Sequence, residues 1–182
     1  MTIEVIYRID PAGHLIQFND QWDLFARDNA TPQLVQGRIT GQTLWNFIQD
    51  PETRHLHQTL AQRAKIRGHP LVLPFRCEAP ALRRFREMEI VPLADGGTEY
   101  RCRILKTETR AAIELLDPRL GQRDEERLLR MCSWCNKVAV ADLWQEVEHA
   151  IIRLKLFDAA TLPGITHTMC DVCLGDLLQE DD

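Results

Sequence analysis

An antiparallel sheet is predicted from residues 71–106, which read LVLPFRCEAPALRRFREMEIVPLADGGTEYRCRILK. The stretch divides into three strand-like runs at Leu71–Glu78, Arg84–Pro92 and Glu99–Lys106. Residues 95–97, Asp-Gly-Gly, supply a turn between the last two runs. Three consecutive strands with such short turns pair antiparallel, because parallel strands need a much longer crossover.

The residues upstream add two strands and a helix. Residues 3–9 alternate largely between apolar and polar side chains, and a turn leads from them to a second strand at His14–Phe18. A longer helix is expected from Pro51, with Asp50 as its N-cap, to Gly68. The predicted fold class is therefore α+β, with a five-stranded antiparallel sheet and helices on one face.

Composition narrows the class of protein. Apolar residues make up 45% of the 182 residues and charged residues 27%, which argues against disorder. The sequence has no apolar run long enough to span a membrane, and its first residues do not resemble a signal peptide, so a cytoplasmic protein is expected. The net charge of −5 disfavours nucleic acid as a partner.

Residues 108–182 are predicted to be helical. Residues 108–130 are highly charged and are expected to form a linker helix, with a hinge at Asp117 and Pro118. Residues 138–157 carry apolar side chains at helical spacing, so residues 131–182 are expected to form a small helical module. The predicted division is a sensor domain at 1–107, the linker helix at 108–130 and this module at 131–182.

Two Cys-x-x-Cys pairs stand in that module. Cys132 and Cys135 form the first pair, Cys170 and Cys173 the second, and 34 residues separate the two. Each pair can direct two thiolates to one centre, and Zn²⁺ takes four such ligands in a closed structural site. The predicted cofactor is therefore one structural zinc ion held by these four residues.

Other roles for the cysteine and histidine residues stay open. The Cys-x-x-Cys pairs could instead form a thiol redox switch, and the same four ligands also suit rubredoxin-like iron. His167, three residues before Cys170, could replace one cysteine or hydrogen-bond to a thiolate. Cys77 and Cys102 have no Cys-x-x-Cys partner and are expected to be ordinary strand residues.

Residues 1–107 resemble a PAS domain. The resemblance rests on Tyr7–His14, Phe18–Ala26 and Gly41–Ile48, followed in the expected order by the helix at residues 50–68. It implies a sensor domain with a five-stranded antiparallel sheet, a pocket that can hold haem, flavin, a small metabolite or no ligand, and pairing into a homodimer; the ligand stays unknown. His57 on the long helix is a haem-ligand candidate by this resemblance, although an exposed histidine is the more common case.

Residues 127–178 resemble a cysteine-rich tail of bacterial signalling proteins. The segments that carry the resemblance are Arg127–Val138, Trp144–Glu148 and His167–Cys173. It implies a sensory or regulatory role with a protein partner. No catalytic motif is evident in the sequence, so the expected function is that of a non-catalytic regulator, with the thiol redox switch as the alternative.

A homodimer is also expected from apolar side chains on or near the predicted linker helix. A charged helix could not bury these side chains alone, and a second copy could cover them. The set is Ile113, Leu116, Leu120, Leu128 and Met131.

Overall fold

The computed structural model describes residues 4–29, 31–117, 123–158 and 161–179. The chain divides into two compact units. The first unit comprises residues 1–74 and 86–105, and the second comprises residues 75–85 and 106–182. Each unit has its own sheet and core, and each is described below by itself.

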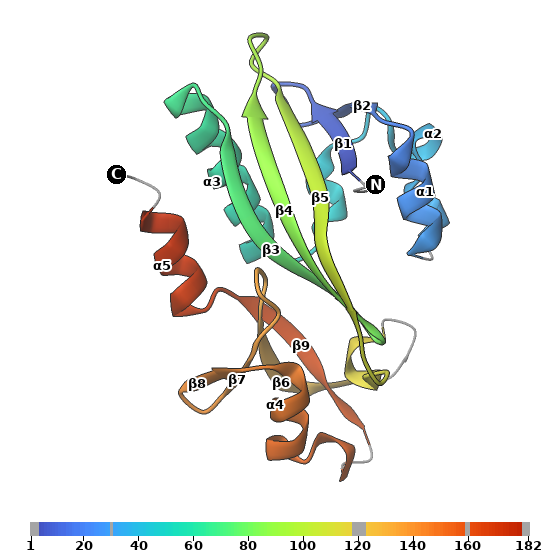
Figure 1. Ribbon diagram of the computed structural model, residues 1–182, viewed down its shortest axis with the longest axis vertical. Coiled ribbons are helices and arrows are strands. Elements are labelled where there is room, and N and C mark those ends of the chain that lie inside the picture. Colours follow the sequence, from blue (N-terminus) through green and yellow to red (C-terminus); the bar gives the residue numbers. More distant parts are fainter. Residues whose placement is uncertain (1–3, 30, 118–122, 159–160, 180–182) are drawn as a thin grey trace. The chain divides into compact units, whose positions relative to one another are not determined.

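The first sheet has five strands in the order β2-β1-β5-β4-β3 (Figure 1). β1 pairs antiparallel with β2 on one side and with β5 on the other, so that Tyr7 lies opposite both Phe18 and Tyr100. The strand bounds are β1 Glu4–Ile9, β2 Leu15–Phe18, β3 Leu71–Ala79, β4 Leu82–Pro92 and β5 Thr98–Thr109. The division between the units falls within β3 and β4 and near the end of β5.

In the described part of the chain between β2 and β3, the structure has five helices. They are α1 Gln21–Asp28, η1 Pro32–Leu34, α2 Gln36–Ile39, η2 Leu44–Phe47 and α3 Pro51–Arg67, where η marks a 3₁₀ helix. α3 begins and ends where the sequence predicted. The Asp50 carboxylate accepts a hydrogen bond from the Thr53 amide at 2.7 Å, and Gly68 follows the helix at a φ of 69°.

The core of the first unit combines aliphatic residues with an aromatic group. Leu15, Ile39 and Ile90 are fully buried or nearly so. Tyr7 stacks on Tyr100 with ring centroids 4.8 Å apart, and the Trp22 ring of α1 meets Tyr7 edge-on at 5.1 Å. These contacts hold α1 against β1 and β1 against β5.

The predicted fold class is wrong, because the C-terminal part is not a linker helix followed by a helical module. It contains a second sheet of four strands in the order β8-β7-β6-β9 (Figure 1). The strands are β6 Arg123–Cys132, β7 Val138–Val140, β8 Leu143–Gln145 and β9 Leu162–Thr168. The helices of this part are η3 Glu114–Leu116, α4 Val147–Leu154, η4 Leu156–Asp158 and α5 Asp171–Gln179.

β6 replaces the second half of the predicted linker helix. Leu129 and Met131 are buried while Leu128 and Arg130 are exposed, which is the two-residue period of a strand. Charged residues at helical spacing, such as Glu126 and Arg130, had favoured a helix. Pairing with β9 overrides that local preference. The predicted hinge at Pro118 lies outside the described residues.

The second core lies between this sheet and α4. Val138 and Val140 of β7 are buried in it, so part of the predicted amphipathic helix is a β-hairpin. Ala141 has a φ of 52° in the tight turn between β7 and β8. The buried members of this core are Ile113, Leu115, Leu129, Met131, Val138, Val140, Val147, Ala150, Ile151 and Leu156.

Candidate metal centre

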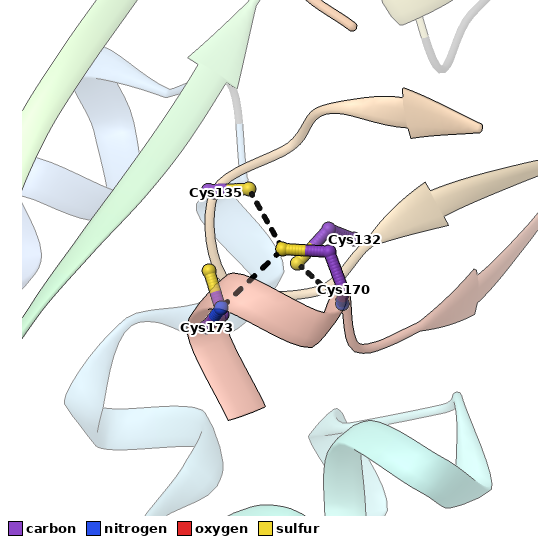
Figure 2. A group of neighbouring side chains, drawn as sticks. All are labelled: Cys132, Cys135, Cys170 and Cys173. Carbon is purple, nitrogen blue, oxygen red and sulfur yellow. Dashed lines mark hydrogen bonds between the residues drawn. The ribbon is translucent and has the colours of Figure 1, made fainter. Parts of the chain in front are cut away.

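The side chains of four cysteines converge in the second unit. The sulfur atoms of Cys132, Cys135, Cys170 and Cys173 all lie within 4.8 Å of one another (Figure 2). Three of the four residues are buried, and Cys135 is partly exposed. All four are free thiols. The structure therefore brings together the four residues that the sequence nominated.

The first pair lies in a tight turn between β6 and β7, and residues 132–137 of this turn are called the knuckle below. The Cys132 amide donates to the Lys137 carbonyl at 2.8 Å, and the Asn136 amide donates to the Cys132 carbonyl at 3.0 Å. Asn136 has a φ of 57°, a left-handed conformation that asparagine tolerates better than most residues. This turn places the sulfur atoms of both cysteines on the same side.

The second pair lies at the start of α5. Cys170 immediately precedes the helix and Cys173 is its third residue. The Cys173 amide donates to the Cys170 sulfur at 3.5 Å, and the Cys170 amide donates to the Cys132 sulfur at 3.4 Å. Amide donors and the positive end of the helix dipole both favour thiolates at this position.

The parallel pairing of β6 with β9 brings the two pairs together. The register places Cys132 opposite Thr168, two residues before Cys170. The Ser133 amide continues the pairing by donating to the Thr168 carbonyl at 2.8 Å. Because both strands run in the same direction, each delivers its cysteine pair to the same end of the sheet.

The sulfur spacing suits a metal ion better than a disulfide. The sulfur atoms of Cys135 and Cys170 lie 3.7 Å apart. Ligands at about 2.3 Å from a tetrahedral centre have edges of roughly 3.8 Å, whereas a disulfide needs about 2.05 Å. These four thiols could hold a metal ion as they stand.

The electrostatics of the group favour one thiolate and resist the others. Hydrogen bonds from the Cys135 and Cys173 thiols hold the pKa of Cys132 far below its usual value. Donating to Cys132 raises the pKa of Cys135 to about 12, and donating to Cys132 and Cys135 raises that of Cys173 well above its usual value. A second thiolate beside that of Cys132 would repel it. A divalent cation at the centre would offset this repulsion and so favour the thiolate form of all four cysteines.

The other nominated residues lie apart from this group. Among the described residues, the metal-capable group contains no histidine; His167 lies on β9 opposite Met131 and is partly buried. Cys102 on β5 is buried, which raises its pKa to about 11, and Cys77 on β3 is partly buried. Neither belongs to the group.

The haem candidate lies on α3. His57 is partly buried, whereas its neighbour His55 is exposed. Desolvation lowers the pKa of His57 to about 4, so its imidazole is neutral near pH 7. A neutral imidazole is the form that ligates iron, and it is also the form that burial favours for any histidine side chain.

Sequence reasoning missed the contacts between the knuckle and residues 75–85, which are called the arm below. The Arg76 amide donates to the Trp134 carbonyl at 2.8 Å, and the Asn136 side chain donates to the Arg76 carbonyl at 2.9 Å. The Phe75 and Trp134 rings lie 5.9 Å apart. The asparagine directly after the second cysteine is a local feature that could have indicated a turn with positive φ.

Sequence reasoning also missed a cluster of three arginines and three glutamates in the second unit, called the ion cluster below. Arg76 makes two hydrogen bonds to Glu146, at 3.0 and 2.9 Å. Arg83 and Arg110 both donate to the Glu148 carboxylate, at 2.8 to 2.9 Å. Glu78, almost fully buried, pairs with all three arginines. The three arginines compensate the charge of the Glu78 carboxylate, which a nearly buried carboxylate requires.

Comparison with known proteins assigns this sequence to no family. No protein-family model matches the sequence, and no curated protein matches it significantly. Among the described residues, no helix has the length and apolar character needed to cross a membrane.

Proposed function

We propose that Cys132, Cys135, Cys170 and Cys173 hold one zinc ion in a structural site. The observation that carries this proposal is the mutual approach of all four sulfur atoms within 4.8 Å. Zinc with four thiolates forms a closed site with no open coordination position, which stabilises a fold and performs no chemistry. The small core of the second unit is of the kind that such a site supports.

The convergence of both pairs favours a metal over the thiol redox switch. A redox pair needs two cysteines, one of them accessible to a reductant, whereas here four converge and three are buried. Iron would occupy the same ligands, and its thiolate complexes are coloured, so the absorption spectrum of the purified protein separates the two metals.

We further propose that the protein is a non-catalytic regulator. The first unit would act as a PAS-like sensor and the metal-bound second unit would dock a protein partner. Support comes from the sequence resemblance and from the element order of the first unit, in which two strands, a set of helices and three strands follow one another.

The homodimer stays a prediction. Three of the five apolar residues that suggested it pack within the second unit instead. Ile113 and Met131 are buried in the second unit's own core, and Leu116 packs against it. Leu128 alone of the set is exposed, and Leu120 lies outside the described residues. Light scattering at tens of micromolar tests the prediction directly, and a monomeric mass would contradict it.

Elemental analysis of the purified protein tests the metal. Protein made with ample zinc and without chelators should carry about one zinc per chain. Cys135→Ser should reduce the zinc content to less than half of that value. Cys77→Ser is the matched control, because Cys77 is a partly buried cysteine of the same unit that lies outside the group, and it should retain full zinc content. Equal metal content in the two variants would refute the site.

A further inference from the structure

Two hydrogen bonds between the arm and the knuckle involve the same arm residue, Arg76, next to the packed rings of Phe75 and Trp134. Arg76 uses both of its backbone polar groups there: its amide donates to the Trp134 carbonyl and its carbonyl accepts from the Asn136 side chain. Trp134 lies between the two cysteines of the first pair, and Asn136 directly follows the second of them. Any change in the course of the knuckle therefore moves both partners of Arg76.

A metal ion bound by the four cysteines would constrain the course of the knuckle. Its turn contains Asn136 at positive φ, and the sulfur atoms of its two cysteines lie within 4.8 Å of those of the second pair. A bound cation would direct four metal–sulfur bonds to one point. Loss of the cation would remove this constraint on the backbone between Cys132 and Cys135, and with it on the Trp134 carbonyl.

A second attachment of the arm does not involve the cysteines. Arg76, Arg83 and Glu78 of the arm join Glu146, Glu148 and Arg110 in the ion cluster. Arg110 also donates through its backbone amide to the Ala81 carbonyl at 3.0 Å. The arm thus stays attached through this cluster when the knuckle loosens, so loss of metal changes its conformation without detaching it.

The arm is continuous with strands that have buried residues in the first unit. β3 contributes Leu71 and Leu73 to the buried residues, and β4 contributes Met88 and Ile90. A change at Arg76 therefore acts on strands whose other ends are fixed in the core of the first unit. The connection is covalent, through the strand backbones themselves.

We propose that metal occupancy of the four-cysteine site is transmitted to β3 through the two hydrogen bonds that the knuckle makes with the Arg76 backbone. The proposal rests on the metal site proposed above. It adds a regulatory device, in which gain or loss of the ion alters the pairing of β3 while the ion cluster keeps the arm in place. Asn136 is the positioning residue of this device.

Hydrogen exchange of the full-length protein tests the device. Amide exchange in residues 75–78 is measured by mass spectrometry in the zinc-loaded protein and after removal of zinc with a chelator. We expect amide exchange at Arg76 to accelerate by roughly tenfold or more on zinc removal, because the amide loses its hydrogen bond to the Trp134 carbonyl. Exchange in residues 108–110 should change much less.

The Asn136→Gly variant tests the coupling between the knuckle and Arg76 while the metal site is kept. Glycine keeps the positive φ of the turn but removes the side-chain donor to the Arg76 carbonyl. This variant should bind zinc fully, while exchange at Arg76 in the zinc-loaded state rises by about 3- to 10-fold. Ala141→Gly is the matched control, since it also places glycine at a positive φ in the second unit and has no described bond to the arm. It should leave exchange in the arm unchanged.

The possible failures are distinguishable. If zinc binds and its removal accelerates exchange in the knuckle but not at Arg76, the coupling is refuted and the metal site stands. The same conclusion follows if zinc-loaded Asn136→Gly has the wild-type exchange rate at Arg76. If the wild-type protein holds no zinc when zinc is supplied, the metal site is refuted and the coupling with it.

Discussion

The Arg76 amide donates a hydrogen bond to the Trp134 carbonyl at 2.8 Å, across 58 positions of the sequence. This bond joins a strand of the first sheet to the turn that carries the first cysteine pair. The rings of Phe75 and Trp134 pack beside it with their centroids 5.9 Å apart. Trp134 is therefore a packing residue as well as part of the turn that carries the first cysteine pair.

Trp134→Ala should destabilise the second unit even when zinc is bound. The side chain is 6% exposed, and truncation of a buried tryptophan typically costs about 3–5 kcal/mol. Trp144→Ala on β8 is the control, because that side chain is only partly buried and should cost less. Denaturant unfolding of the zinc-loaded variants measures both. Equal losses for the two variants would contradict the role assigned to Trp134.

Arg110→Met should destabilise the second unit through the ion cluster. Arg110 pairs with Glu78 and Glu148, and removing it leaves the nearly buried Glu78 with less compensating charge. The expected cost is about 2–4 kcal/mol of unfolding free energy, since a broken buried pair costs more than a surface pair contributes.

Lys106→Met is the comparison for Arg110→Met. Lys106 pairs with Glu108 on the surface and is largely exposed, so its removal should cost much less unfolding free energy than removal of Arg110. A cost at Arg110 no larger than that at Lys106 would show that the ion cluster contributes no more than a surface pair.

Gly13→Ala should destabilise the first unit. Gly13 has a φ of 91°, and an added Cβ would overlap the Trp45 Nε1 atom. The combined strain and overlap should cost about 2 kcal/mol or more. Gly37→Ala is the matched control, because a Cβ there meets nothing within 4 Å and the residue lies in α2. It should leave the melting temperature unchanged or raise it.

The first unit should become less stable as the pH is lowered through the range in which His57 titrates. The pKa of this imidazole is about 4 in the folded protein, below the ordinary value of 6.5, because burial disfavours its charge. Between those two values the unfolded chain binds more protons, so the folded state loses stability as the pH falls from 6.5 to 4. The loss should reach about 1–3 kcal/mol.

His57→Gln should reduce this pH dependence, whereas His55→Gln, at an exposed site on the same helix, should not. Hydrogen exchange within α3 at pH 7.5 and pH 5 reports on the first unit without interference from acid release of metal. A wild-type slope in His57→Gln would contradict the assignment.

Much of the first unit could be predicted from the sequence because its determinants are local. The strands at Leu71 and Thr98 begin within a residue of the predicted positions, and Asp50 and Gly68 delimit α3 as expected. The second sheet could not be predicted in this way. The pairing of Leu129 with Ile165 spans 36 positions, and the charged residues around Glu126 favour a helix when read alone.

The four cysteines of the candidate site could be predicted because the two members of each pair stand close together in the sequence. Each Cys-x-x-Cys pair defines two ligands within four residues, and four thiols at such spacing favour one centre. The contact of Asn136 with Arg76 joins residues 60 positions apart and leaves no pattern in either segment. For this reason the four-cysteine group could be predicted from the sequence, but its connection to β3 could not.

X-ray absorption at the zinc edge of the purified, full-length protein is the most direct test of the metal centre. The account predicts one zinc per chain with four sulfur scatterers at about 2.3 Å and no nitrogen or oxygen in the first shell. Nitrogen or oxygen ligands in place of sulfur would contradict the four-cysteine assignment. Protein that contains no zinc and carries disulfides among Cys132, Cys135, Cys170 and Cys173 would replace the structural site with the thiol redox switch.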